Sequence, residues 1–333
     1  MMHFIRFLLV VPFFVFLLLP EPGSGEEPAK RLKAGIIGLD TSHVTAFTKY
    51  LNDPAAKGPA ANVKIVAAFP GGSPDVPASR DSVAGYTKEL REKYGVEIVD
   101  SIEALLPKVD VILLESVDGR PHLEQVKPVL KARKPVFIDK PVAGSLADAV
   151  QIYLLAKEAN VPCFSSSSLR FSPGVFALRN DPQVGRVLGC DVYGPCSLEE
   201  HHPDLFWYGI HGVEMLFTVM GTGCESVVRV QTKDSDLVTG IWQGGRVGTF
   251  RGIRKGASGY GGTAFGEKAI VRFGKYAGYE PLLVEICRFF QSGKPPVSAE
   301  ETLEIFAFME AADESKRQGG KPVTLESVMA KVR

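Results

Sequence analysis

Short runs of consecutive apolar residues alternate with amphipathic segments along the first half of the chain. The apolar runs, which are typical of buried strands, lie at residues 33–38, 63–68, 96–99, 111–114, 135–138 and 161–164. Apolar positions at helical spacing lie at residues 42–51, 82–94, 121–132 and 145–160, the last helix with Ser145 as its N-cap. Continuous apolar strands joined through helices predict a doubly wound, Rossmann-type parallel sheet in an α/β fold.

The pattern changes after Arg170. Strand-like segments then follow one another without intervening helices, at residues 187–193, 226–232, 236–242 and 246–251, and a closing helix is predicted at 302–316. This order predicts a mostly antiparallel sheet in an α+β domain. We therefore expect a Rossmann-type domain over residues 31–145 and an α+β substrate or oligomerisation domain over residues 146–333. A chain of 333 residues is long enough for both.

The N-terminal segment has the pattern of a secretory signal peptide over residues 1–25. Residues 1–6 carry one positive charge, residues 7–19 are apolar except for Pro12, and Gly23-Ser24-Gly25 supplies small residues after them. The apolar run is shorter than the about 20 residues that span a bilayer. We expect export to the periplasm or the extracellular space. The alternative is an uncleaved signal that anchors the chain, which would be its only membrane contact.

Composition excludes some classes of partner. The chain has 38 basic and 38 acidic residues, so no charge excess favours nucleic acid. Its five cysteines are odd in number and lack paired metal-ligand spacing, so at least one stays free. Cys190 and Cys196 flank a predicted turn and could form a disulfide. Isolated buried thiols are the simpler expectation.

The segment Trp207-Tyr208-Gly209-Ile210-His211-Gly212-Val213-Glu214 carries the first candidate chemistry. One helical turn separates His211 from Glu214, which places a histidine and a carboxylate on the same helix face as a potential proton-transfer pair. A second candidate is Lys140, in Phe137-Ile138-Asp139-Lys140-Pro141 at the end of a predicted strand. Together these motifs indicate a dehydrogenase-like site.

The glycine loop that would hold a dinucleotide is altered. The first strand runs into Gly38-Leu39-Asp40-Thr41-Ser42-His43, where the pattern Gly-x-Gly-x-x-Gly keeps only its first glycine. Asp40 brings bulk and negative charge to the position of the second glycine. An Asp, Thr or Ser before a helix more often serves as a cap. The second strand also ends in Phe69-Pro70-Gly71-Gly72-Ser73, without the acidic residue that usually binds the ribose hydroxyls.

From about residue 32 to 325, these features resemble the Gfo/Idh/MocA oxidoreductases. The resemblance rests on the Rossmann pattern, on Asp139-Lys140-Pro141, where family members typically carry Glu-Lys-Pro, and on Gly209-Ile210-His211-Gly212-Val213-Glu214, where they carry Gly-x-His-x-x-Asp. This chain departs from the family at Trp207, which replaces an aspartate. The loop 116–122 matches the family's nicotinamide-side loop well only at His122.

The resemblance implies a set of site residues. The expected catalytic residues are Lys140, His211, Glu214 and Tyr208, with His211 as base, Lys140 assisting, and Tyr208 in place of the missing acid. The expected contacts to NAD or NADP are Gly38, Asp40, Thr41, Ser42, His43, Ser116, His122, Asp139, Lys140 and Pro141. The expected contacts to a carbohydrate-like substrate are Arg170, Trp207 and Tyr208. The family likeness also implies association into a homo-oligomer.

The function implied is hydride transfer between NAD(P) and a sugar, polyol or related hydroxy compound. Two alternatives stay open: an NAD-dependent enzyme that cleaves glycosides, and a cofactor-free carbohydrate-binding descendant of the family. Apparent export and the altered loop favour the last, whereas retention of Lys140, His211 and Glu214 argues against it. No metal site is expected, because Glu199, Glu200, His201 and His202 fit no spacing template for ligands.

Overall fold

The computed structural model describes residue 1, residues 31–274 and residues 276–332. The predicted signal segment therefore lies outside the described residues, apart from Met1. Within the described part, no helix is both long and apolar enough to span a bilayer.

The first sheet is entirely parallel, as the apolar runs predict. Its strands run in the order β3-β2-β1-β4-β5-β6. Their bounds are β1 (Leu32–Ile37), β2 (Val63–Phe69), β3 (Glu97–Ile98), β4 (Val111–Leu114), β5 (Val136–Ile138) and β6 (Cys163–Ser165). The strand order reverses between β1 and β4, which makes the carboxyl ends of these strands the topological switch point where α/β sheets bind ligands.

Helices connect the strands of this sheet. They are α1 (Ser42–Leu51), α2 (Pro77–Arg80), α3 (Val83–Tyr94), α4 (Ile102–Leu105), α5 (His122–Lys131) and α6 (Leu146–Ala159). The four long helices lie within two residues of their predicted bounds, because each has a clear apolar face. Ser145 is the predicted N-cap of α6, and its hydroxyl accepts a hydrogen bond from Asp148 N at 3.1 Å. The single-turn helices α2 and α4 are too short to show a period.

The second sheet has seven strands in the order β12-β11-β7-β10-β9-β8-β13. Their bounds are β7 (Val187–Pro195), β8 (Cys224–Gln231), β9 (Ser235–Trp242), β10 (Arg246–Ile253), β11 (Gly261–Gly266), β12 (Ile270–Phe273) and β13 (Val323–Thr324). All neighbouring pairs are antiparallel except β7 and β10, which run parallel. The predicted α+β architecture with a mostly antiparallel sheet is thus confirmed.

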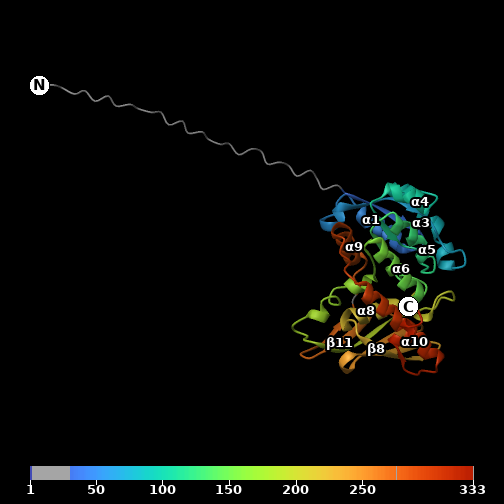
Figure 1. Ribbon diagram of the computed structural model, residues 1–333, viewed down its shortest axis with the longest axis vertical. Coiled ribbons are helices and arrows are strands. Elements are labelled where there is room, and N and C mark those ends of the chain that lie inside the picture. Colours follow the sequence, from blue (N-terminus) through green and yellow to red (C-terminus); the bar gives the residue numbers. More distant parts are fainter. Residues whose placement is uncertain (2–30, 275, 333) are drawn as a thin grey trace. The chain divides into compact units, whose positions relative to one another are not determined.

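The remaining helices divide between the two halves of the molecule. They are α7 (Asp204–Trp207), α8 (Ile210–Met220), α9 (Glu280–Ser292), α10 (Ala299–Arg317) and α11 (Leu325–Met329). Helices α8 and α10 cover one face of the second sheet, whereas α9 returns to the first half (Figure 1). There Phe289 packs edge-on against Phe164, with ring centroids 4.9 Å apart.

The expected domain boundary at residue 145 stays a prediction. The parallel sheet continues beyond it to β6, α9 shares the apolar core of the first sheet, and residues 31–333 form one compact unit. The chain therefore crosses between its two halves more than once.

All five cysteines are buried and free. The alternative of a disulfide between Cys190 and Cys196 is therefore not formed, and the simpler expectation of isolated buried thiols is confirmed.

Gly212 fixes how closely α8 packs on the second sheet. A Cβ atom there would lie 2.1 Å from Cε2 of Phe250, which is fully buried in β10. We predict that Gly212→Ala lowers the free energy of unfolding by about 1–3 kcal/mol, since the helix or the ring must move. Thermal unfolding of this variant and of Gly85→Ala tests this. Gly85 is an exposed helical glycine with open space around it, so its variant should lose no stability. Equal midpoints for both variants would contradict the packing argument.

Candidate functional site

Gly38, which the altered glycine motif retains, and Asp40, which replaces its second glycine, hold the loop after β1 in place. Gly38 has φ +89°, and a Cβ atom there would lie 2.4 Å from the backbone nitrogen of Ser116. Only glycine fits this turn. The Asp40 carboxylate accepts hydrogen bonds from Ser79 Oγ at 2.6 Å and from Val117 N at 2.9 Å. Asp40 thus ties the loop after β1 to the segments that follow β2 and β4.

The predicted capping role belongs to Thr41 and not to Asp40. Thr41 is the N-cap of α1, and its hydroxyl accepts from His43 N at 3.4 Å. Ser42, the first helical residue, is exposed and lies 3.4 Å from the hydroxyl of Tyr279.

A buried cluster of charged side chains occupies the switch point. His43 Nδ1 lies 2.9 Å from Asp139 Oδ2 and 3.6 Å from Glu115 Oε2, and Lys140 Nζ lies 3.8 Å from Asp139 Oδ2. Glu115 follows β4 and Asp139 follows β5, so the parallel topology brings both carboxylates to the helix that begins after β1. Both carboxylates are completely buried.

Burial and charge act in opposite directions on these groups. Burial alone would lower the pKa of His43, but the Asp139 charge and the contacts with Asp139 and Glu115 raise it to about 10. Burial raises the pKa of Glu115 to about 7. Burial would also raise the pKa of Asp139, yet the charges of His43 and Lys140 hold it well below its usual value.

His211 lies at the start of α8 in the second half of the chain and is buried. Its Nδ1 is 2.7 Å from Ser167 Oγ, in the segment that follows β6. Burial lowers its pKa well below 6.5, and the nearby positive charge of Lys140 lowers it further. A neutral imidazole, the form that accepts a proton, therefore lies near Lys140. The rings of Tyr208 and Tyr260 meet His211 edge-on, with centroids at 5.4 Å and 5.9 Å.

Glu214 is engaged in a buried ion pair. Its Oε1 accepts from Arg170 Nε and from Ser166 Oγ, both at 2.7 Å. Arg170 Nη1 in turn donates to Glu301 Oε1 at 2.7 Å, and the arginine is only 3% exposed. This placement argues against the expected roles of Glu214 in proton transfer and of Arg170 in substrate binding. The ion pairs join the start of α10 and the segment after β6 to α8.

Several other expected contacts also have structural partners. Both ring nitrogens of His122 lie within hydrogen-bond distance of backbone carbonyls, those of Val142 at 3.2 Å and Ser116 at 2.9 Å. Ser116 Oγ donates to Gln125 at 2.9 Å. The Lys140–Pro141 peptide bond is cis. The ring of Trp207 packs against the ring of His202, with centroids 4.9 Å apart.

The acidic and histidine-rich segment ahead of α7 forms its own hydrogen-bonded network. Glu199 lies 2.8 Å from Nδ1 of both His201 and His202. His202 Nε2 lies 3.1 Å from Asp118 and accepts from Gly119 N at 3.3 Å. Arg120 pairs with Asp118 and Asp75 at 2.7 Å and 2.9 Å. The network links the two halves of the chain through the loop after β4.

Sequence reasoning missed Glu115, Ser166, Ser167 and Tyr279. Glu115 directly follows four apolar residues of β4, and a carboxylate at that position is a signal that could have been read, because parallel strands end at one edge. Tyr279 meets the His43 ring at 4.5 Å, a contact between residues 236 positions apart that no local pattern reports.

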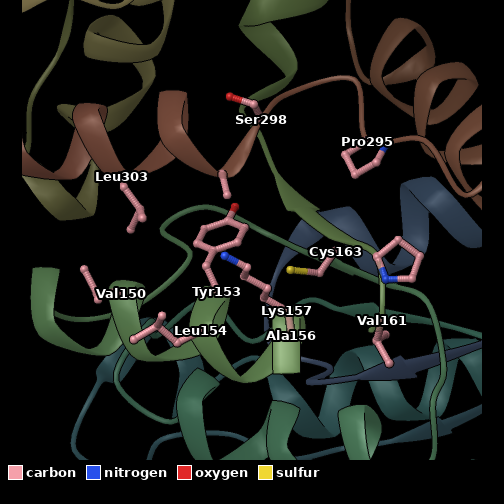
Figure 2. A pocket seen from close by; sticks show the side chains of 12 residues that line it. Val150, Tyr153, Leu154, Ala156, Lys157, Val161, Cys163, Pro295, Ser298 and Leu303 are labelled. Carbon is pink, nitrogen blue, oxygen red and sulfur yellow. The ribbon is translucent and has the colours of Figure 1, made fainter. Parts of the chain in front are cut away.

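The open pocket in Figure 2 lies away from these residues. It has a volume of about 510 Å³ and is lined by α6, by the segment 161–163 and by the start of α10, including Tyr153, Cys163 and Leu303. Apolar side chains dominate its lining, and none of the candidate catalytic residues reaches it.

Comparison with known proteins identifies the first half of the chain. Residues 32–167 match the model of an oxidoreductase family with an NAD-binding Rossmann fold, Gfo/Idh/MocA. These residues belong to the Gfo/Idh/MocA oxidoreductase family. The resemblance inferred for the Rossmann-type part, which includes Lys140, is thereby confirmed, whereas His211 lies outside the matched residues.

Two curated relatives of the family align with part of the chain. One is the 1,5-anhydro-D-fructose reductase of Ensifer adhaerens, 31% identical over 31% of this chain and 32% of the relative. Another is the myo-inositol 2-dehydrogenase of Thermotoga maritima, 29% identical over 42% of this chain and 46% of the relative. The aligned regions span less than half the length of these relatives.

Solved structures match the fold over almost all of the chain. A probable dehydrogenase from Thermotoga maritima has a TM-score of 0.71 at 23% identity, covering 89% of this chain and 100% of the other. A scyllo-inositol dehydrogenase from Lactobacillus casei, solved with NAD(H) and scyllo-inositol, has a TM-score of 0.74 at 15% identity, with 89% and 100% covered. The fold of the second half thus also matches structures of dehydrogenases.

The residues present fit the family's dinucleotide at two places and depart from it at a third. The glycine turn at Gly38 is retained, and Lys140 lies at the switch point. Asp40, however, is 3% exposed and fills the position of the second glycine, which normally lets the pyrophosphate approach the backbone. Burial raises the pKa of this carboxyl, against the opposing hydrogen bonds from Ser79 and Val117.

The buried ion pair of Glu214 gives a stability prediction. We expect Glu214→Gln to lower the free energy of unfolding by about 3–5 kcal/mol, because it leaves the Arg170 charge without one of its two carboxylates. Denaturant unfolding measures this. The control is Glu89→Gln, which breaks an exposed pair with Lys93 and should change stability by less than about 1 kcal/mol. A midpoint for Glu214→Gln as high as that of the control would show that the buried pair contributes nothing.

Proposed function

We propose that this chain is an NAD(P)-dependent oxidoreductase that acts on a sugar, a polyol or a related hydroxy compound. The observation that carries the proposal is the buried His211 of α8, whose pKa is lowered by burial and by the charge of Lys140 at the switch point of the parallel sheet. A cation and a neutral base close together are what dehydrogenation of an alcohol needs. The family's NAD-binding Rossmann model supports the same chemistry.

The dinucleotide would be held by the turn at Gly38, by the start of α1 around Thr41 and Ser42, and by Lys140. When bound, it would accept or donate a hydride. Asp40, at the position of the second glycine, departs from the family pattern in this loop. An acidic side chain after the second strand would favour NAD, and a basic one would favour NADP. Here Asp75 is paired with Arg120, and Arg80 with Asp81, so we propose NAD or NADP as cofactor.

The protein's own residues divide the remaining work. His211 takes the hydroxyl proton of the substrate, since burial keeps its imidazole neutral. In the tautomer that can act as base, His211 Nδ1–H donates to Ser167 Oγ, which leaves the lone pair of Nε2 free to accept the proton. Lys140 stabilises the developing negative charge on the substrate oxygen. Tyr208, which is partly exposed beside His211, contacts the substrate.

The substrate class rests on the relatives. Curated relatives are named for 1,5-anhydro-D-fructose and myo-inositol, both cyclic polyhydroxy compounds. Aromatic rings stack well on the apolar faces of such rings, and Tyr208, Tyr260 and Tyr279 surround the two histidines. We therefore propose a cyclic sugar or polyol as substrate.

Export and association are further parts of the proposal. The signal pattern at residues 1–25 supports a periplasmic or extracellular location, with a membrane anchor as the alternative. The second sheet leaves one face exposed, and its apolar side chains include Tyr193, Val230, Ile241 and Val247. Exposed apolar residues gathered on one sheet face favour a homo-oligomer.

The roles of His211 and Lys140 predict a sharp loss of turnover. His211→Asn and Lys140→Met should each lower kcat by about 10²–10⁴-fold. NADH formation is measured with a panel of cyclic polyols that begins with myo-inositol. In the unaltered protein, the acid limb of kcat/KM should lie below pH 6.5, because a base with a lowered pKa is protonated only there. Unchanged turnover in both variants would contradict the proposed roles of His211 and Lys140.

Asp40 predicts an effect on cofactor affinity. Asp40→Gly should tighten binding of NAD or NADP about tenfold, which equals about 1.4 kcal/mol, because it removes bulk and negative charge from the pyrophosphate side of the loop. Calorimetric titration measures this, with Asp53→Gly, an exposed loop position after α1, as the control. Equal affinities for Asp40→Gly and the control would mean that this loop does not contact the pyrophosphate.

The same assays separate the alternatives. A glycoside-cleaving enzyme would turn over a glycoside without net NADH. The filled loop at Asp40 favours the second alternative, a cofactor-free carbohydrate binder, which would bind sugars but neither dinucleotide.

A further inference from the structure

We propose that His43, Glu115 and Asp139 form a binding site for one divalent transition-metal ion at the switch point of the parallel sheet. The inference goes beyond the proposed function and does not depend on bound dinucleotide. It revises the expectation that the chain has no metal site.

The donor atoms have the spacing of a coordination sphere. His43 Nδ1 lies 2.9 Å from Asp139 Oδ2 and 3.6 Å from Glu115 Oε2, and one donor atom from each residue lies within 4.8 Å of the others. Metal–ligand bonds of about 2.1 Å in tetrahedral or octahedral geometry place neighbouring ligand atoms about 3.0–3.4 Å apart. His43 lies in α1, and Glu115 and Asp139 directly follow β4 and β5, so the sheet sets the positions of both carboxylates.

The polar atoms of this cluster are unsatisfied within the described part of the chain. His43 Nδ1, both oxygens of Glu115 and both oxygens of Asp139 are buried and have no aligned hydrogen-bond partner. Buried carboxylates without donors are costly and rare in folded proteins. The Glu115 side chain is completely buried, so bulk solvent does not reach its oxygens.

Protons and Lys140 account for only part of the cluster. A proton on His43 Nδ1 faces Asp139 at 2.9 Å but is not aligned with it, and Lys140 Nζ lies 3.8 Å from the same carboxylate. Neither the proton on His43 nor the Lys140 ammonium group donates an aligned hydrogen bond to Glu115. A metal ion between the three residues would satisfy both carboxylates and the imidazole together.

The histidine network around Glu199 provides a contrast. Glu199 faces the ring nitrogens of His201 and His202 at 2.8 Å, and His202 Nε2 accepts from Gly119 N. That network therefore contains the same residue types, but its polar atoms have hydrogen-bond partners. Residue type alone does not distinguish the two clusters, whereas hydrogen bonding does.

The ligand set indicates which ions would bind. One imidazole nitrogen and two carboxylates suit Mn²⁺, Fe²⁺ or Zn²⁺ better than Mg²⁺ or Ca²⁺, which prefer oxygen alone. Three protein ligands leave at least one position for water or a substrate oxygen. Metal binding would release the proton from His43 Nδ1. A divalent ion and Lys140 would then exceed the two carboxylates by one positive charge, which favours an oxyanion there.

The test is a titration of the untagged chain with Mn²⁺ after metal has been removed with EDTA, without dinucleotide or substrate. Binding is measured as the loss of the electron paramagnetic resonance signal of free Mn²⁺. We expect one Mn²⁺ per chain, not displaced by a tenfold excess of Mg²⁺, and a higher thermal midpoint with Mn²⁺. Glu115→Gln should weaken binding by at least about tenfold and abolish the thermal shift. Glu199→Gln is the matched control and should bind as the unaltered protein does.

His43→Asn serves as the second variant should Glu115→Gln fail to fold, with the same weakening expected. The absence of stoichiometric Mn²⁺ in the folded, unaltered protein would overturn the proposal. Equal binding by Glu115→Gln and Glu199→Gln would overturn it as well. Failure here would leave the proposed oxidoreductase function standing, since dinucleotide binding is measured separately.

Discussion

Two carboxylates buried together at the carboxyl edge of a parallel sheet are the constraint on which this site depends. Glu115 and Asp139 are completely buried, and among the described residues His43 and Lys140 are the cationic groups paired with them. Burying charge is unfavourable unless it is paired or bound to a metal. The start of α1, which carries His43, and Lys140 therefore lie beside these two carboxylates.

The second half of the chain adds a base to this charged edge. Ser167 holds His211, and the ion pair of Glu214 with Arg170 joins α8 to the segment after β6. The parallel sheet thus supplies cation and carboxylates, while α8 supplies a neutral imidazole. The expected pair of His211 and Glu214 separates into two roles, because the carboxylate turns to the buried arginine and the imidazole turns to Ser167.

Much of the fold could be predicted because the apolar runs of β1, β2 and β4 are continuous and the helices between them have one apolar face. Single-turn helices and α9 were missed, since their positions depend on packing between distant segments. The site was predictable in part: Lys140 and His211 stand in short motifs. The contact between His43 and Glu115 could not be predicted from a local pattern, because these residues are far apart in the sequence. They come together only when the ends of β1 and β4 lie side by side in the folded sheet.

The central claim is that a dinucleotide binds at this switch point despite Asp40. Native mass spectrometry of the full-length, folded protein, as purified and after addition of NAD and NADP, tests it most directly. We expect one saturable dinucleotide per chain, either retained from purification or acquired on addition. A folded protein that binds neither NAD nor NADP would contradict it and would favour a cofactor-free carbohydrate binder.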